Sequence, residues 1–190
     1  MHLLSAADAS AVTAARLLAL DSIETAKSGH PGAALSLAPV AHLLFQRHVR
    51  HNPASPDWLG RDRFVLSCGH ASMLLYSQLY LCGYDVSIED LKSFRALESL
   101  TPGHPEYGHT PGVDATTGPL GQGLAMGVGM AMGLAHQRAL YDPNAPAGDS
   151  PFDSTVWVLC SDGDLQEGLS YEAGAFAGHQ RLGNLVVVYD

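Results

Sequence analysis

The sequence predicts an α/β protein built on a mainly parallel sheet with helices on both faces. Short apolar runs alternate along the chain with longer segments of helical periodicity, which is the order expected of βαβ units. The last two runs, residues 155–160 and 184–190, are almost uniformly apolar, as strands covered on both faces are. With 190 residues, of which 46% are hydrophobic and 15% charged, the chain can form one domain with a sizeable core.

The amino-terminal part is expected to be mainly helical. Residues 5–29 are rich in Ala and Leu at close to helical spacing, and Gly29 is a plausible end of that helix. Residues 32–49 predict a second helix, which Pro39 either kinks or begins. A turn-rich loop then leads into a short buried strand at residues 63–67.

The remaining elements follow the same alternation. We expect helices at residues 70–83 and 87–97, the second opening with Ser87 and Asp90 as a capping pair. A stretch dense in glycine and proline, residues 101–123, should be irregular, and irregular segments of that length inside a domain are usually functional. A final series comprises a helix at 124–141, a linker at 142–154, a strand at 155–160, a helix at 165–181 and a strand at 184–190.

Charge and cysteine content exclude several function classes. The formal net charge is −9 and no Lys/Arg cluster stands out, which argues against nucleic-acid binding. Three cysteines without CxxC spacing predict neither a disulfide framework nor a zinc site and favour a reducing compartment. No secretory signal and no run of roughly 20 apolar residues is present, so we expect a cytoplasmic protein without membrane contact.

An acidic, glycine-containing turn, "CSDGDLQEG" at residues 160–168, follows a predicted strand and precedes a predicted helix. Asp162 at that edge can hold Mg²⁺ or Ca²⁺, while Gly163 lets backbone amides approach phosphate oxygens. The structural alternative makes Asp162 or Asp164 a helix cap and Glu167 its capping-box partner.

Three histidines lie in glycine- and proline-rich turns. His30 follows a predicted helix end in "SGHPG", His70 follows a strand in "LSCGH", and His104 lies within "TPGHP". Imidazoles titrate near neutral pH and suit proton transfer, although His30 taken alone is better explained as an incidental residue of a helix-terminating turn. The spacing GxxGxG at residues 118–123 differs from the dinucleotide fingerprint GxGxxG and follows a loop, so a nicotinamide site is excluded.

Four segments together resemble the amino-terminal, diphosphate-binding domain of transketolase. They are "SGHPGAALSLAPVAHLLF", "DRFVLSCGHASMLLY", "DLKSFRALESLTPGHPEYGHTPGVDATTGPLGQG" and "SDGDLQEGLSYEAGAFAGHQRLGNLVVVYD", and they cover nearly the whole chain in one register. The resemblance implies the thiamine diphosphate-binding fold. It also implies transfer of a two-carbon ketol unit from a ketose phosphate to an aldose phosphate, with thiamine diphosphate and a divalent cation, Mg²⁺ or another such as Ca²⁺. It further implies a homodimer.

The resemblance also implies individual residue roles. Asp162 resembles the metal ligand, and Glu167 resembles a carboxylate at the dimer interface. His30 resembles the histidine that transfers protons near the reacting carbonyl, and His104 resembles the one that contacts a hydroxyl of the donor sugar. The residues expected to contact the cofactor are His70, Gly118, Pro119, Leu120 and Gly163.

Two departures from the family pattern affect these expectations. Ser161 stands where the family usually has glycine, and the asparagine expected as a second metal ligand would fall beyond Asp190. Residues 1–190 are therefore expected to be an incomplete diphosphate-binding domain, without the pyrimidine-binding and carboxyl-terminal domains and inactive when isolated. The alternatives are a related enzyme, dihydroxyacetone synthase or deoxyxylulose phosphate synthase, and a non-catalytic remnant that binds partners.

Overall fold

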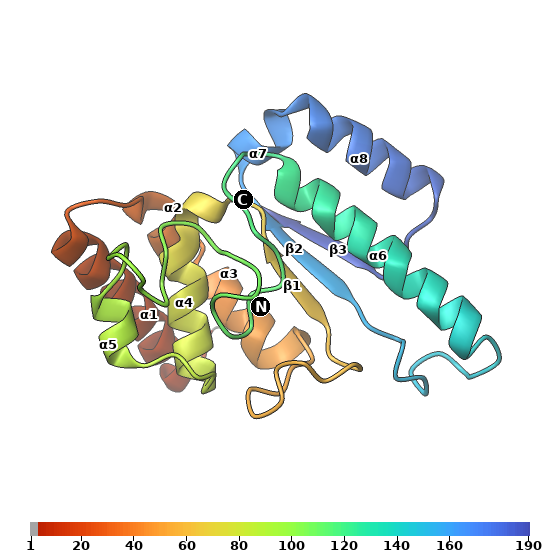
Figure 1. Cartoon of the computed structure of the whole chain (residues 1–190), viewed down its shortest axis with the longest axis horizontal. Helices are drawn as coiled ribbons and strands as arrows, with labels where there is room; N and C mark the ends of the chain where they lie inside the picture. The colour runs from red at the N-terminus through yellow and green to blue at the C-terminus, as the bar shows by residue number, and fades with distance from the viewer. Residues whose placement is uncertain (1–3) are drawn as a thin grey trace.

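The computed structural model describes residues 4–190 and confirms the predicted α/β class (Figure 1). Its sheet has three strands in the order β1 (Arg63–Leu66), β2 (Val156–Cys160) and β3 (Leu185–Tyr189). Both strand pairs are parallel, with Leu66 opposite Leu159 and Cys160 opposite Tyr189. The carboxyl ends of all three strands therefore meet at one edge of the sheet.

Helices cover both faces of this sheet (Figure 1). Phe64, Leu66 and Leu159 pack into the larger apolar cluster, with the helices of the amino-terminal half. Val65 and Val158 point to the other face and pack under α6 (Gln122–Tyr141), beside which lies α8 (Gly168–His179). The helices on the first face are α1 (Ala6–Ala26), α2 (Pro31–Ser36), α3 (Ala38–Leu43) and α4 (Ser72–Cys82).

The first helix begins as its sequence predicts and ends slightly earlier. Ser5 caps α1 because its Oγ accepts from Asp8 N at 3.1 Å, while Asp8 Oδ2 accepts from Ser5 N at 3.0 Å. Lys27 ends the helix in the left-handed conformation with φ 53°, two residues before Gly29.

Two predicted helices are interrupted. The helix expected at residues 32–49 is not continuous: α2 stops at Ser36, and a π-helical turn follows α3 at Leu44–His48. Pro39 lies in the first turn of α3, which is one of the two positions that the sequence predicted for it. Proline has no N–H to donate, so it is tolerated only where a helix begins.

The helix expected at residues 165–181 is also divided, into α7 (Asp162–Gln166) and α8. Glu167 between them is extended, with ψ 138°. Ser170 Oγ donates to the carbonyl of Asp164 at 2.6 Å, so a side chain occupies an acceptor that a continuous helix would use. The helix expected at 87–97 is shortened to α5 (Ile88–Lys92), which starts with the predicted Ser87–Asp90 capping box.

The glycine- and proline-rich segment has no helix or strand until α6 starts at Gln122, as predicted. Its last part runs beside β1. Asp114 Oδ2 accepts from Phe64 N at 2.9 Å, and Thr117 Oγ1 donates to Leu66 O at 2.8 Å.

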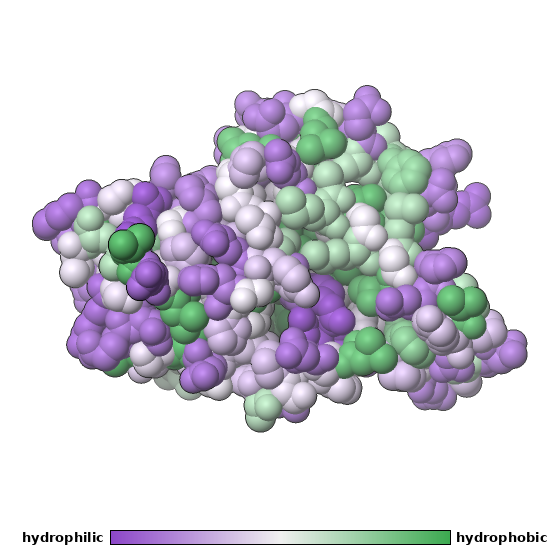
Figure 2. Space-filling view, viewed as in Figure 1, coloured by the Kyte–Doolittle hydropathy of each residue, from purple (hydrophilic) through white to green (hydrophobic). Residues whose placement is uncertain are grey.

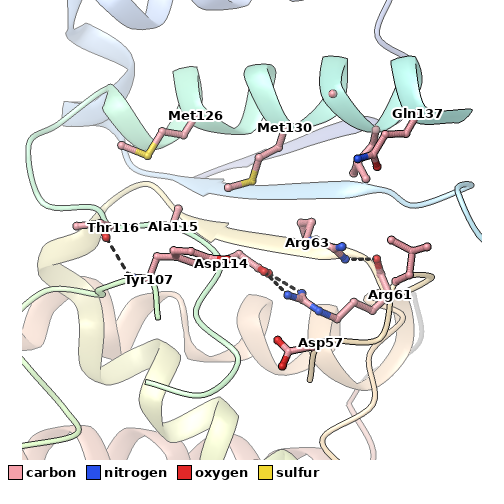
Figure 3. A pocket seen from close by; sticks show the side chains of 13 residues that line it. Asp57, Arg61, Arg63, Tyr107, Asp114, Ala115, Thr116, Met126, Met130 and Gln137 are labelled. Carbon is pink, nitrogen blue, oxygen red and sulfur yellow. Dashed lines mark hydrogen bonds and ion pairs between the residues drawn. The ribbon is translucent and has the colours of Figure 1, made fainter. Parts of the chain in front are cut away.

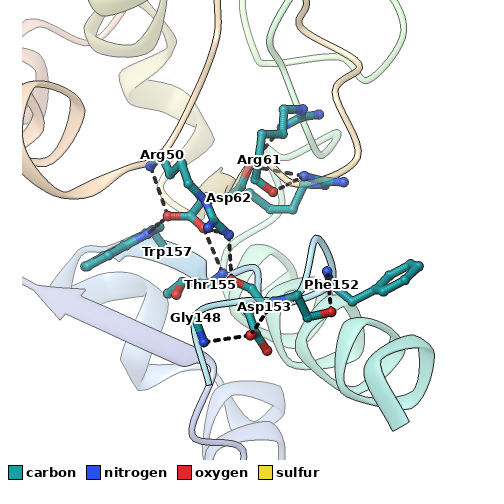
Figure 4. A network of polar contacts seen from close by, with 10 residues as sticks. Arg50, Arg61, Asp62, Gly148, Phe152, Asp153, Thr155 and Trp157 are labelled. Atoms are coloured by element: carbon teal, nitrogen blue, oxygen red, sulfur yellow. Dashed lines mark hydrogen bonds and ion pairs between the residues drawn. The ribbon is translucent and has the colours of Figure 1, made fainter. Parts of the chain in front are cut away.

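A buried aspartate joins the amino ends of β1 and β2 (Figure 4). Asp62 accepts hydrogen bonds from Arg50 N at 3.0 Å, Thr155 N at 2.9 Å and the indole Nε1 of Trp157 at 3.0 Å. These contacts align the two strands at the end opposite to the predicted site.

Candidate functional site

The predicted site residues follow neighbouring parallel strands. A 3₁₀ turn, Gly69–Ala71, follows β1 and carries His70, whereas α7 follows β2 and begins with Asp162. Leu66 and Leu159 are register partners, so the two turns leave the sheet at the same edge. In Figure 1 this edge lies where α2, α7 and the end of the glycine-rich segment approach one another.

The three predicted imidazoles lie together at this edge. The ring centroids of His30 and His70 are 5.2 Å apart in an edge-to-face arrangement. His30 lies immediately before α2 with φ −119°, an ordinary extended conformation, so the proline that follows it sets the helix start. His104 packs on Gly118: a Cβ at Gly118 would lie 3.3 Å from its Cδ2.

Glycines let the backbone segments of the site approach closely. A Cβ on Gly69 would lie 2.7 Å from the amide nitrogen of Gly118, so a side chain there would collide with backbone. A Cβ on Gly163 would contact Leu120 at 3.5 Å. The segment 118–120 is thereby placed between His104 and the acidic turn.

The two aspartates of the acidic turn have different environments. Asp164 is fully buried, and its carboxylate accepts from Gly121 N at 2.9 Å and from Ser161 N at 3.3 Å. Asp162 is exposed at the first position of α7. Asp164, and not Asp162, therefore has the structural role of a capping residue. Its capping-box partner is Ser161 and not the predicted Glu167.

Glu167 is exposed, and its Cβ lies 2.8 Å from where a Cβ on Gly121 would be. It is thus beside the end of the glycine-rich segment. Ser161 has φ −106° and ψ 170°, which any residue adopts, so no glycine is required there and the departure from the family pattern introduces no strain.

Burial lowers the pKa of two of the histidines. For His70 the cause is desolvation and then the neighbouring His30, partly offset by Asp164. For His104 the causes are desolvation, Arg95, His30 and His70, in that order. Both imidazoles are therefore neutral at pH 7, with one nitrogen that donates a hydrogen bond and one that accepts.

Two residues of α4 that the sequence analysis missed hold the backbone around His104. Ser72 Oγ donates to the carbonyl of Gly103 at 2.9 Å. Tyr76, which is fully buried, donates to the carbonyls of Pro102 at 2.9 Å and His104 at 3.2 Å. No sequence pattern identifies these contacts, because their acceptors are backbone atoms far away along the chain. The sequence marks Asp164 only as a possible helix cap, and its capping-box spacing from Ser161 is the signal that indicates its structural role.

The described residues provide an incomplete set of metal ligands. In residues 4–190, no group of three or more His, Cys, Asp or Glu side chains is arranged to hold a metal ion. Asp162 is a free carboxylate at the sheet edge, whereas Asp164 already accepts hydrogen bonds from two backbone amides. The residues therefore fit one carboxylate ligand of a divalent cation.

Cys68 and Cys160 are buried near this edge, and burial raises the pKa of each thiol to about 12. Neither thiol is therefore suited to act as a nucleophile, which requires the thiolate. Within the described part of the chain, no helix is both long enough and apolar enough to span a membrane.

A cleft of about 700 Å³ lies between α6 and the segment beside β1 (Figure 3). Met126 and Met130 form one wall, and Arg61 forms a bidentate ion pair with Asp114 on the other, at 2.6 and 3.0 Å. None of the nine predicted site residues lines this cleft. A search for cavities would therefore not have identified the edge that carries the histidines.

Comparison of the sequence with models of known protein families identifies the family of this chain. The model described as "Transketolase, thiamine diphosphate binding domain" matches residues 7–190. The chain belongs to the transketolase family. The resemblance inferred from sequence motifs is thereby confirmed, and the family's enzymes are transferases.

Individual transketolases are similar in sequence to this chain over almost its whole length. The transketolase of Mycobacterium tuberculosis is 56% identical over 183 residues, which is 96% of this chain and 26% of that protein. The transketolase of Geobacillus stearothermophilus is 57% identical over 180 residues, 95% of this chain and 26% of that protein. The chain therefore spans about a quarter of the length of these relatives.

Solved transketolase structures share the fold. The Pichia stipitis transketolase in complex with sedoheptulose 7-phosphate superposes with a TM-score of 0.91 at 52% identity, covering 98% of this chain and 27% of that one. The Leishmania mexicana transketolase gives a TM-score of 0.92 at 43% identity, covering 100% of this chain and 28% of that one.

Proposed function

We propose that this chain is the diphosphate-binding part of a transketolase that transfers a two-carbon ketol unit between sugar phosphates. The observation that carries the proposal is the convergence of three histidines, a glycine-rich segment and an acidic turn at one edge of a parallel sheet. In open α/β sheets, ligands bind at the carboxyl ends of the strands. The family match and the relatives' names favour transketolase over the related enzymes considered from the sequence.

The cofactor's diphosphate is assigned to the acidic turn and the neighbouring segment. Asp162 supplies a carboxylate ligand to the divalent cation, Mg²⁺ in our proposal. The residues assigned to contact thiamine diphosphate are His70, Gly118, Pro119, Leu120 and Gly163. When bound, thiamine diphosphate supplies the carbon nucleophile that attacks the ketose carbonyl.

The other two histidines are assigned to the substrate. His30 transfers a proton at the oxygen of the reacting carbonyl, a role for which an imidazole is suited because it can both donate and accept a proton. His104, neutral at pH 7, exchanges a hydrogen bond with a hydroxyl of the donor sugar. His104 packs on Gly118, and His30 lies against His70, so each contacts a residue assigned to the cofactor.

The proposal extends to assembly and location. Glu167 is exposed beside Gly121 and is assigned to the contact between two subunits of a cytoplasmic homodimer. We propose that residues 1–190 form only the diphosphate-binding domain and that the isolated chain does not turn over sugar phosphates. This is supported by the absence, among the described residues, of a group of three or more side chains arranged to hold a metal ion, and by the quarter length relative to full transketolases.

A chimera tests the proposal. Residues 7–190 replace the matching segment of the Geobacillus stearothermophilus transketolase, and a coupled pentose phosphate assay follows turnover with thiamine diphosphate and Mg²⁺. We expect cofactor-dependent activity in the chimera and none in the isolated chain.

Asp162→Ala should abolish the Mg²⁺ dependence of thiamine diphosphate affinity in calorimetry, whereas Asp85→Ala, at another exposed aspartate, should not. Unchanged affinity in a folded Asp162→Ala chimera would remove Asp162 from the metal role. Turnover by the isolated chain would refute its proposed inactivity.

A further inference from the structure

Arg95 has a conformation and an environment that its stabilising contacts do not explain. Its backbone is left-handed with φ 62°, an unfavourable conformation for a residue with a long side chain. Its Nε and Nη2 atoms are buried, and neither has a hydrogen-bond partner among the described residues. Unsatisfied buried donors and strained backbone both cost stability, and they are concentrated at functional sites.

The Arg95 side chain lies between the two histidine-bearing turns. We define the His104 turn as residues 102–105 and the His30 turn as residues 27–30. The guanidinium lies against Gly103, where a Cβ would be 3.0 Å from Nε and 3.2 Å from Cζ. Its Nη1 donates to Ser28 Oγ at 2.9 Å. One planar group thus contacts both turns.

The neighbouring residue supports the same arrangement. Phe94 is buried, and its Cε1 lies 3.1 Å from where a Cβ on Gly29 would be. The Arg95 guanidinium also lies over the Phe94 ring, 5.4 Å from its centroid. Two consecutive residues therefore contact two consecutive residues of the His30 turn, Ser28 and Gly29.

We propose that Arg95 is a positioning residue for the histidine cluster, which fixes the His104 turn against the His30 turn and places a permanent positive charge beside the imidazoles. The proposal rests on the proposed function, because only in that function do His30 and His104 act on the same substrate. Arg95 itself is not assigned any contact with substrate or cofactor.

The charge has a consequence for His104. Among the groups around this imidazole, Arg95 is the largest electrostatic contribution that lowers its pKa, followed by His30 and His70. A guanidinium stays protonated at every accessible pH. It therefore disfavours imidazolium at His104 throughout the working range and keeps its hydrogen-bonding pattern constant.

Histidine titration of the 190-residue chain by NMR tests this directly, without cofactor or activity. Arg95→Gln removes the charge and keeps a planar amide that can reach Ser28. We expect the pKa of His104 to rise toward 6.5, the ordinary value for histidine, with a smaller rise or none at His70. Lys92→Gln is the matched control, because it removes an exposed positive charge nearby on α5 and should leave His104 unchanged.

A purely structural Arg95 would change stability without changing the His104 titration. An unshifted pKa of His104 in a folded Arg95→Gln chain therefore overturns the proposal. If Arg95→Gln does not fold, Arg95→Lys decides, since it keeps the charge and loses the planar contact with Gly103. Faster amide exchange at Gly103 and His104 supports positioning, and unchanged exchange overturns it.

The chimera separates this proposal from the proposed function. With Arg95→Gln we expect a lower kcat at unchanged thiamine diphosphate affinity, and a pH profile whose acidic limb moves to higher pH. A chimera with native Arg95 that binds no thiamine diphosphate would count against the proposed function. The NMR titration would still decide the role of Arg95.

Discussion

Two glycines of α6 differ sharply in what surrounds them, and alanine should stabilise the chain at one of them but not at the other. A Cβ on Gly127 would lie 2.4 Å from Cγ2 of Val158, which is fully buried in the central strand. A Cβ on Gly129 would have nothing within 4 Å. Both substitutions gain the same helix propensity, about 1 kcal/mol.

The difference between the two variants isolates the packing of α6 on the sheet. Carbon atoms prefer a separation of about 3.5–4.0 Å, so the Gly127 methyl group is too close by about 1 Å or more. Overpacking of this kind costs about 1–3 kcal/mol. We therefore expect Gly129→Ala to stabilise the chain by about 1 kcal/mol, and Gly127→Ala to be about 1–3 kcal/mol less stable than Gly129→Ala.

Urea unfolding of the 190-residue chain, followed by circular dichroism, measures both variants against the native sequence. Thermal unfolding should show the same order, at about 2–4 °C per kcal/mol for a chain of this size. If Gly127→Ala is as stable as Gly129→Ala, α6 does not pack on Val158 as closely as described, and the reasoning fails.

Two further outcomes are expected of the same chain. Asp62→Ala should lower the free energy of unfolding by about 3 kcal/mol or more, because three donors lose their acceptor. Asp62→Asn should lower the free energy of unfolding by less. Equal decreases for the two variants in urea unfolding would contradict this account. The free energy of unfolding should also fall as pH drops from about 7.5 to about 5. Folding lowers the pKa of His70 and His104 below the ordinary 6.5, so the unfolded chain binds more protons than the folded chain in this range. The double variant His70→Gln/His104→Gln should flatten that dependence, and an unchanged slope would show that other groups cause it.

Local chemistry explains why much of the fold was predictable. Ser5 and Ser87 start helices because each is followed three residues later by an aspartate that completes a capping box. The apolar runs became parallel strands, but only β2 is paired on both sides and buried, whereas β3, equally apolar in sequence, is a partly exposed edge strand among the described residues. Where the predicted helices failed, at Leu37 and Glu167, the interruption depended on neighbouring groups, such as the bond from Ser170 to the Asp164 carbonyl.

The sequence by itself determined the α/β class, the family and the residue types of the site, because periodicity, capping and motif spacing are local properties of a chain. Only the tertiary structure decided that Asp164 is the buried anchor while Asp162 stays free, that Tyr76 and Ser72 hold the backbone around His104, and that Arg95 joins two turns. Those roles depend on hydrogen bonds and close approaches between segments distant in the chain. Such contacts leave no periodic signal, because their geometry exists only after the sheet and its helices have packed.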